Sequence, residues 1–128
     1  MNDKIPLLSS ELVVEFKIKR KKHFATVNVD VYDDEYNALE DLNARDLKRL
    51  ERHEIGNFII VVRASYLGFK GLDVLGGVML STDNKGPVEA KDIISDNLMI
   101  ENAIVDLKSL IQANVDILQE SGLVKSLI

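Results

Sequence analysis

Positive charge is most concentrated between residues 17 and 22, where the sequence reads KIKRKK. The stretch holds five cations and no acid. Lys19, Arg20, Lys21 and Lys22 together suit the phosphates of a nucleic acid, because each contact releases condensed counterions. Aromatic residues that stack on bases are not interleaved with these cations, so nucleic acid is not the favoured partner. The alternative interpretation is a solvated turn whose lysines discourage pairing between strand edges.

Negative charge gathers in the next part of the chain. Residues 30–41 hold six acids and no cation, and Asp33, Asp34 and Glu35 lie near the centre of this block. A face of this kind can occupy a basic groove on a partner protein, as inhibitor and immunity proteins do. The same residues also suit the start of a helix, since Asp is a favoured N-cap and acids stabilise the positive end of the helix dipole.

Four glycines within residues 68–77 invite comparison with phosphate-binding loops. Neither G-x-G-x-x-G nor G-x-x-x-x-G-K-[ST] is present, and the residues after Gly77 are typical of a strand rather than a helix. The favoured interpretation is structural. Gly68 and Gly71 are predicted to shape a turn, and Gly76 and Gly77 to form a bulge or to let another backbone come close.

Residue types that carry catalysis or bind metals are sparse. The chain has no Cys, and neither His23 nor His53 has a second ligand at helical spacing, so both are expected on the surface. No serine-hydrolase motif is present. A remaining enzyme hypothesis requires four side chains to converge in one cleft: Arg63, Ser65, Tyr66 and Asp73. We therefore expect a non-enzymatic protein without a metal or a cofactor.

Length and composition indicate one cytoplasmic domain spanning residues 1–128. With 46% hydrophobic and 29% charged residues and a net charge of −5, the chain can bury a core and carries an acidic surface. The absence of Cys fits a reducing compartment. The longest apolar run, residues 58–62, is far shorter than the roughly 20 residues that a membrane helix needs. Residues 1–10 are typical of a loose leader rather than a secretory signal.

Alternating polarity predicts two pairs of strands. Residues 12–18 and 23–31 alternate with period two and are rich in β-branched residues, and the few residues between them leave room only for a hairpin turn. Residues 58–66 and 72–80 are predicted to be neighbouring central strands. Polar residues come late in the 58–66 strand, so we expect its first half to be covered on both faces.

Helices are predicted after each pair of strands. The first follows the acids at residues 33 and 34, ends by Gly56, and carries an apolar stripe formed by Tyr36, Leu39, Leu42, Leu47 and Leu50. Residues 81–87 are predicted to be a loop. Pro87 suits the start of a short helix over 88–94, which the predicted order leaves out. The second helix begins at Ser95 or Asp96 and runs to about Glu120. The predicted fold is α+β: a four-stranded, mainly antiparallel sheet with two helices in the order β-β-α-β-β-α.

The long C-terminal helix is expected to extend past its own sheet. A helix of about 24 residues spans roughly 36 Å, whereas strands of about eight residues reach roughly 26 Å. Val115 and Leu118 in the overhanging part, and Leu123 beyond it, add apolar surface that usually finds a partner. We therefore expect a homodimer; the alternative is that the tail folds back onto its own core.

These patterns favour a small protein-interaction or regulatory protein, for instance an inhibitor or a mobile-element accessory protein. It is expected to contact a second copy of itself and an unidentified protein partner. The candidate interface residues are Asp33, Asp34, Glu35, Val115, Leu118 and Leu123. The alternative is a nucleic-acid-binding accessory protein that uses the cations at residues 19–22.

Overall fold

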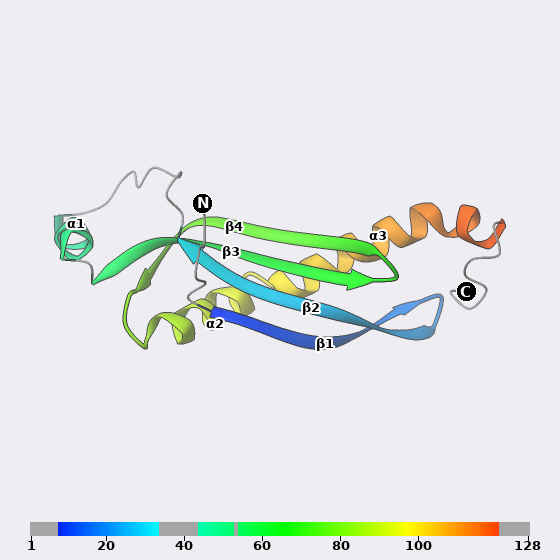
Figure 1. Cartoon of the computed structure of the whole chain (residues 1–128), viewed down its shortest axis with the longest axis horizontal. Helices are drawn as coiled ribbons and strands as arrows, with labels where there is room; N and C mark the ends of the chain where they lie inside the picture. The colour runs from blue at the N-terminus through cyan, green and yellow to red at the C-terminus, as the bar shows by residue number, and fades with distance from the viewer. Residues whose placement is uncertain (1–7, 34–43, 53, 121–128) are drawn as a thin grey trace.

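Four antiparallel strands form a single sheet with the order β1-β2-β3-β4 in the computed structural model (Figure 1). The structure describes residues 8–33, 44–52 and 54–120. The strands are β1 (Leu8–Ile18), β2 (Lys21–Asp33), β3 (Ile55–Tyr66) and β4 (Phe69–Ser81), and the helices are α1 (Ala44–Glu51), α2 (Gly86–Asp96) and α3 (Met99–Glu120). The predicted α+β class and its four-stranded antiparallel sheet are confirmed.

The predicted order β-β-α-β-β-α is wrong at its end, because two helices follow β4. α2 covers the segment that the predicted order left out, and α3 begins at Met99, after the two residues offered as its cap. Asn97 ends α2, since its backbone N–H and its side-chain amide both donate to the carbonyl oxygen of Ile93. Leu98 then adopts a φ of 53°. A left-handed residue therefore divides two helices whose apolar spacing looks continuous.

β1 and β2 form the predicted hairpin around a two-residue turn at Lys19 and Arg20. The first strand begins earlier than expected, since Leu8 already lies opposite Val31. Residues 8–10, predicted to be part of a loose leader, therefore belong to the sheet. Pairing along the whole strand ties this N-terminal segment down.

The second hairpin joins β3 to β4 through Leu67 and Gly68, both of which have a positive φ. Farther along β4, the register shifts so that Gly76 and Gly77 lie opposite Ile59. Two residues facing one is the pattern of a β-bulge. The predicted turn at Gly68 and the predicted bulge are both confirmed.

α2 and α3 cover one face of the sheet. Alternate residues of β2 and β3 point into this face and form a core with residues of both helices, among them Val27, Val29, Ile60, Val62, Ala90, Ile94, Leu107 and Ile111. Ile59 and Val61 lie half-buried on the opposite face, outside this core. Among the described elements, the expectation that the first half of β3 is covered on both faces is therefore wrong.

Gly71 in β4 is where α3 comes closest to the sheet. A Cβ atom at this position would lie 2.9 Å from the Cα atom of Leu107 and would overlap the backbone carbonyl oxygen of Ala103. Only glycine leaves room for a helix backbone to rest on a strand backbone in this way. The prediction that Gly71 belongs to a turn is wrong, because the residue lies within the strand.

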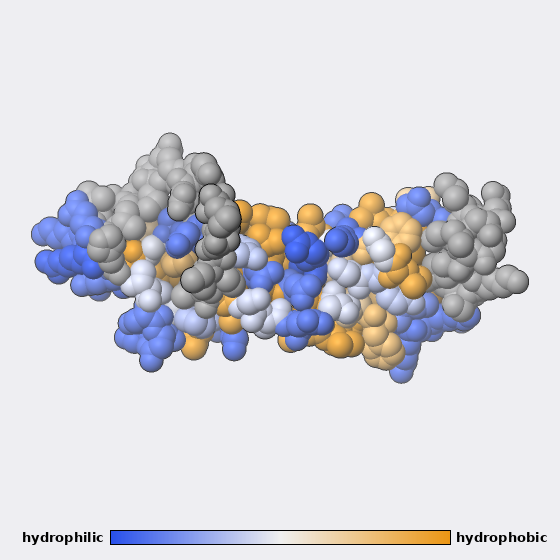
Figure 2. Space-filling model, in the orientation of Figure 1, coloured by the Kyte–Doolittle hydropathy of each residue, from blue (hydrophilic) through white to orange (hydrophobic). Residues whose placement is uncertain are grey.

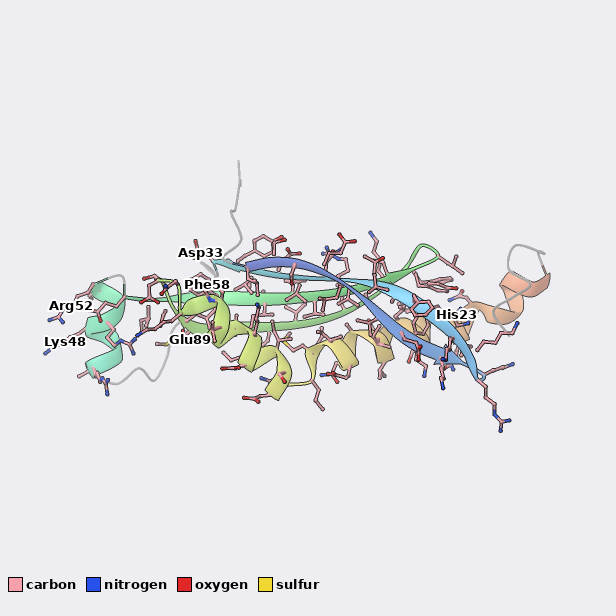
Figure 3. All side chains as sticks on the ribbon, turned by 90° about the horizontal axis from the view of Figure 1, so that it is seen from below. His23, Asp33, Lys48, Arg52, Phe58 and Glu89 are labelled. Atoms are coloured by element: carbon pink, nitrogen blue, oxygen red, sulfur yellow. The ribbon has the colours of Figure 1, made fainter. Side chains whose placement is uncertain are left out.

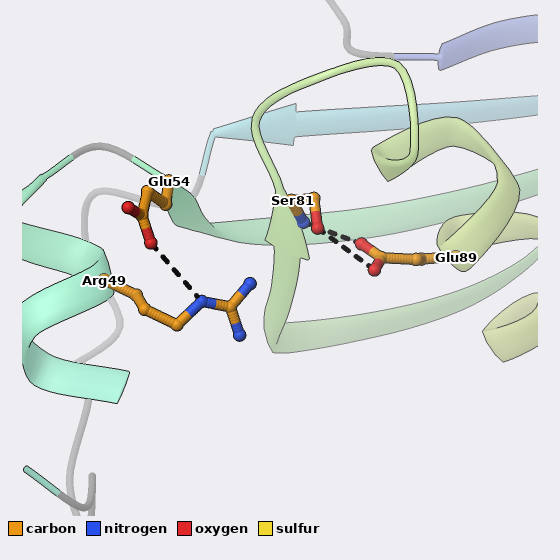
Figure 4. A network of polar contacts seen from close by, with 4 residues as sticks. All are labelled: Arg49, Glu54, Ser81 and Glu89. Carbon is orange, nitrogen blue, oxygen red and sulfur yellow. Dashed lines mark hydrogen bonds and ion pairs between the residues drawn. The ribbon is translucent and has the colours of Figure 1, made fainter. Parts of the chain in front are cut away.

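Polar contacts fix the ends of β3 and β4 to the neighbouring helices (Figure 4). At the end of β4, the backbone N–H and the hydroxyl of Ser81 donate to the two carboxylate oxygens of Glu89 in α2, at 2.7 and 3.1 Å. Before β3, Glu54 lies 3.7 Å from the guanidinium of Arg49 in α1. The part of the predicted first helix that lies in residues 34–43 is outside the described residues.

α3 extends past the ends of the strands, but not because it is longer than the sheet. Its 22 residues span about 33 Å, whereas the 13 residues of β4 span roughly 43 Å. α2 packs under the start of the sheet, and α3 then runs diagonally toward the β4 side (Figure 1). The overhang is therefore a result of where α3 begins.

His23 is buried in the core face of β2, with 7% of its surface exposed, so the expectation of a surface histidine is wrong. Its Nδ1 atom lies 2.8 Å from the hydroxyl oxygen of Tyr66, and Phe16 packs edge-on against the tyrosine ring at a centroid distance of 5.2 Å. The Nε2 atom has no hydrogen-bond partner among the described residues. Alternation in residues 23–31 predicts this inward position, because His23 shares a face with Ala25.

We expect Gly71→Ala to lower the free energy of unfolding by about 2 kcal/mol, because an inserted methyl group must push the α3 backbone away. Chemical denaturation measures this loss. Gly56→Ala is the matched control: its new Cβ would lie 2.9 Å from the Phe58 ring edge, which can rotate aside. Equal losses in the two variants would contradict the backbone contact.

We expect Tyr66→Phe to cost about 1–2 kcal/mol of stability, because the His23 ring then loses its partner inside the core. A double variant with Tyr66→Phe and His23→Leu should recover part of this loss, since replacing both polar partners leaves no buried group unpaired. Denaturation of both variants gives the comparison. An unchanged single variant shows that the hydrogen bond is dispensable.

Candidate interaction surfaces

The four predicted nucleic-acid contacts lie together at the tip of the first hairpin. All four side chains are exposed, and Lys22 Nζ lies 3.8 Å from Glu15 Oε1. Lys19 and Arg20 have φ values of 47° and 72°. The left-handed conformation costs an ordinary residue about 1–2 kcal/mol, and a turn of this shape usually contains Asn-Gly. Cations therefore occupy positions that another sequence would fit better.

The acidic candidates do not adjoin the basic tip. Asp33 is the last residue of β2 and lies opposite Phe58, at the other end of the sheet from the tip (Figure 3). Asp34 and Glu35 are outside the described residues. Within the described part of the acidic block, Asp30 accepts a hydrogen bond from the Ser9 hydroxyl at 2.6 Å.

The apolar candidates for a dimer interface fall at the end of the chain. Val115 and Leu118 lie in α3, but their side chains are outside the described part of the structure, and so is the whole of Leu123. The predicted contact through this region stays a prediction. α3 does carry exposed apolar side chains earlier, at Val105 and Leu110.

The four residues of the enzyme hypothesis do not converge. Tyr66 and Asp73 lie on the core face of the sheet, where Tyr66 contacts His23 and Asp73 accepts a hydrogen bond from Asn102 at 3.1 Å. Arg63 and Ser65 alternate with buried residues of β3 and point to the opposite face. The sheet separates the two pairs, so the arrangement offers no common cleft.

The face of the sheet opposite the helices is mixed in polarity (Figure 2). It carries exposed apolar side chains at Val13, Phe24, Leu72 and Val74. Arg63 in β3 lies opposite Leu72 in β4 and separates Leu72 from the apolar side chains of β1 and β2 on this face. Among the described residues of this face, polar side chains therefore lie between exposed apolar ones.

A groove with a mainly apolar lining runs along the other side of β1. It consists of two adjoining hollows of about 310 and 300 Å³ that share Ile100 and Glu101. We call it the β1 groove. Its apolar lining comes from β1, β2, α2 and α3: Leu8, Leu12, Val14, Phe16, Val29, Ile94, Ile100, Ile104 and Val105. Figure 3 shows this side of the molecule, with β1 above α2 and α3.

The rim of the β1 groove is positively charged, although the chain as a whole is acidic. Lys91 of α2 and Lys108 of α3 line it. Of the two acids in the lining, Glu15 lies beside Lys22 at 3.8 Å, which leaves Glu101 as the acid without an ion pair among the described residues. The groove therefore presents an apolar floor with an excess of cations around it.

The two edges of the sheet differ in what lies beside them. On the β4 edge, the backbone N–H of Leu72 donates to Asp106 of α3 at 2.9 Å, and the glycine bulge bends the strand. β1 pairs with β2 from Leu8 to Ile18 without a register shift, and no other described strand lies on its far side. An unpaired, regular edge is a template for another strand.

A second cluster of cations lies at the far end of the molecule. Arg45, Lys48, Arg49 and Arg52 surround an open hollow of about 660 Å³ together with Glu54. The labelled side chains Lys48 and Arg52 point away from the sheet (Figure 3). Sequence analysis assigns these four cations to the C-terminal half of the predicted first helix, where they suit the helix dipole, and does not treat them as a binding surface.

Sequence analysis also missed the β1 groove. Its walls come from residues 8–17 and 91–108, which only the folded chain brings together. The available signal was the amphipathic closing helix, in which Val105 departs from the buried stripe, together with Leu12 at the edge of the sheet. Both side chains remain exposed in the fold, at 62% and 40% of their surface.

No described helix is long and apolar enough to cross a lipid bilayer. The described His, Asp and Glu side chains form no group of three that could hold a metal ion. No family model matches the chain, and comparison with curated proteins and with solved structures finds no match either.

Proposed function

We propose that this protein is a non-enzymatic interaction protein that binds an extended, mainly apolar segment of another polypeptide in the β1 groove. The observation that carries the proposal is the apolar lining of this groove, which the protein's own described residues leave uncovered. We further propose that this binding serves a regulatory or inhibitory role in the cytoplasm.

The shape of the groove favours an extended partner. It follows β1 from Leu8 to Lys17, a distance of roughly 30 Å at 3.3 Å per residue. An extended segment of about ten residues covers this length. Leu12 and Val105 lie on opposite walls, so a bound segment can cover both and remove their exposed surface from water.

The charge of the groove favours a partner that is acidic at its ends. Lys91, Lys108 and the unpaired Glu101 lie on the helix wall of the groove, so carboxylates on the partner meet a net positive rim. Such rim contacts contribute more to partner choice and association rate than to affinity. The uncharged floor supplies most of the binding free energy through apolar burial.

We expect Val105→Asp to weaken peptide binding at least about ten-fold, because a carboxylate left unpaired in a closed apolar contact costs about 1–3 kcal/mol. Fluorescence anisotropy with a labelled ten-residue peptide of Leu, Val and Ala, carrying Asp at both ends, measures the affinity.

Val88→Asp is the matched control for Val105→Asp. Val88 is equally exposed, at 60% against 62%, but lies in α2 outside the groove lining. This variant should bind as the parent protein does. Equal weakening by both variants, or equal binding of a Ser/Gly peptide of the same length, would contradict the proposal.

Nucleic-acid binding at the hairpin tip is the second candidate function. It rests on the turn itself: Lys19 and Arg20 keep a positive φ where Asn-Gly would relieve strain. Backbone strain of this kind tends to persist where a side chain has a role. The tip also projects at one end of the sheet, where its cations can reach a phosphate backbone.

We expect the double variant Lys19→Asn/Arg20→Gly to unfold with a free energy about 1 kcal/mol higher than the parent protein, since both residues tolerate the left-handed conformation. If the tip binds nucleic acid, the same variant should lose oligonucleotide binding at low salt. Denaturation and anisotropy with labelled single- and double-stranded oligonucleotides test the two effects separately.

Lys48→Ser/Arg52→Ser is the control for charge, because it removes two exposed cations from the α1 cluster at the other end of the molecule. It should leave oligonucleotide binding unchanged. If both double variants lose oligonucleotide binding equally, the oligonucleotide is attracted to exposed cations in general and not to the hairpin tip. If the parent protein does not bind oligonucleotides at low salt, nucleic-acid binding is ruled out as a function of the tip.

A further inference from the structure

No other described strand pairs with the outer edge of β1, and the hydrogen-bonding groups of this edge can be assigned residue by residue. The turn residues Lys19 and Arg20 are flanked by Ile18 and Lys21, and in such a turn the first residue's carbonyl accepts from the fourth residue's N–H. Ile18 therefore bonds to β2, and every second residue of β1 before it does the same. The residues between them, from Ser9 to Lys17, direct their backbone groups away from β2.

The outward residues carry a pattern of charge. Glu11, Val13, Glu15 and Lys17 follow one another at alternate positions, and all are exposed. Their side chains lie on the sheet face opposite the helices, while Leu12, Val14 and Phe16 point toward the β1 groove. A strand that pairs with this edge must place opposite charges across from the first set of residues and apolar side chains across from the second.

We propose that β1 pairs antiparallel with β1 of a second copy, about a two-fold axis that passes through Val14. The two four-stranded sheets then form one continuous sheet, with the helices of both copies on the same side. This contact uses the backbone edge of β1 and does not rest on the peptide-binding role of the groove.

The position of the axis follows from the charges. With the axis at Val14, Glu11 lies opposite Lys17 of the second copy, and the symmetry repeats this pair. On the other face, Leu12 meets Phe16 of the second copy, and the two Val14 side chains meet each other. Opposite charges and apolar side chains directly across an antiparallel pair both stabilise it.

Neighbouring axes are disfavoured by the same residues. An axis at Val13 places Glu11 opposite Glu15 of the second copy, twice. An axis at Glu15 places two Glu15 side chains against each other. An axis at Leu12 places no cation opposite an acid. Like charges directly opposite one another destabilise a strand pair. An axis at Phe16 also places Glu15 opposite Lys17, but it pairs only residues 14–18, because β1 ends at Ile18. The Val14 axis matches opposite charges over the longer stretch of residues 10–18 and is therefore preferred.

Charge reversal tests the register. Glu11→Lys and Lys17→Glu should each raise the dimer dissociation constant about ten-fold, because each creates two like-charge pairs. The double variant restores opposite charges and should recover the parent constant. Sedimentation equilibrium across micromolar concentrations measures all four proteins. A parent protein that stays monomeric, or a double variant no better than the single ones, overturns the proposal.

Disulfide trapping tests the axis directly, since the chain has no other Cys. With the axis at Val14, two Val14→Cys side chains lie in a pair with Cα atoms about 4.5 Å apart, within the range of a disulfide. Val13→Cys is the control: its Cα atoms are then about 8 Å apart, beyond that range. Mild oxidation should therefore cross-link the Val14→Cys protein alone.

The opposite result, cross-linking at residue 13 and not at residue 14, places the axis elsewhere and overturns the proposed register. Val105→Asp separates this inference from the peptide-binding role. That variant should still sediment as a dimer while it loses the peptide, because Val105 lies on the helix wall of the groove and not on the edge of β1. A monomeric Val105→Asp protein would contradict pairing through β1 alone.

Discussion

The contact between the α3 backbone and Gly71 determines how the helices lie on the sheet. Because Ala103 and Leu107 rest directly on β4, α3 is held close to that strand, and hydrogen bonds from Leu72 to Asp106 and from Asn102 to Asp73 strengthen the same side. A helix held over β4 cannot also cover β1. The β1 groove is therefore a consequence of the close contact at Gly71 on the β4 side of the sheet.

Because of this asymmetry, the β4 edge is protected from pairing with other strands, whereas the β1 edge can pair. The β4 edge has a helix carboxylate on one of its backbone donors and a glycine bulge that disturbs its regularity, two features that protect an edge from other strands. β1 has a regular edge with Glu11, Val13, Glu15 and Lys17 at its successive outward positions. Such charges discourage pairing with most strands, but they favour a strand that places an opposite charge across from each of them. The same residues can thus exclude wrong partners and select a right one.

Local patterns predicted the elements whose neighbours in space are also neighbours in sequence. The alternation in residues 23–31 and the short connection before it identify a hairpin without further information. The short helix after Pro87 was left out of the predicted order, and the start of the last helix was placed at Ser95 or Asp96 rather than at Met99, because Leu98 takes a positive φ in a segment that keeps helical spacing. The packing role of Gly71 and the burial of His23 depend on residues far away in the chain. The β1 groove was beyond prediction for the same reason, since its walls are about 80 residues apart, whereas the exposed cations at residues 19–22 could be read directly from the sequence.

Among the described elements, β1 packs extensively on β2 alone, whereas β2, β3, β4 and α3 hold one another in a connected layer. Cooperative units with few contacts open at lower free energy than the rest of a structure. In a single protomer, residues 8–18 therefore form the natural unit of partial opening, and their amides should exchange with solvent before those of β3. Opening also relaxes the left-handed turn at Lys19 and Arg20, which releases strain that the closed hairpin holds. β1 is thus the strand with the lowest free energy of local opening. A partner that binds to β1 therefore raises this local stability as well as covering exposed surface.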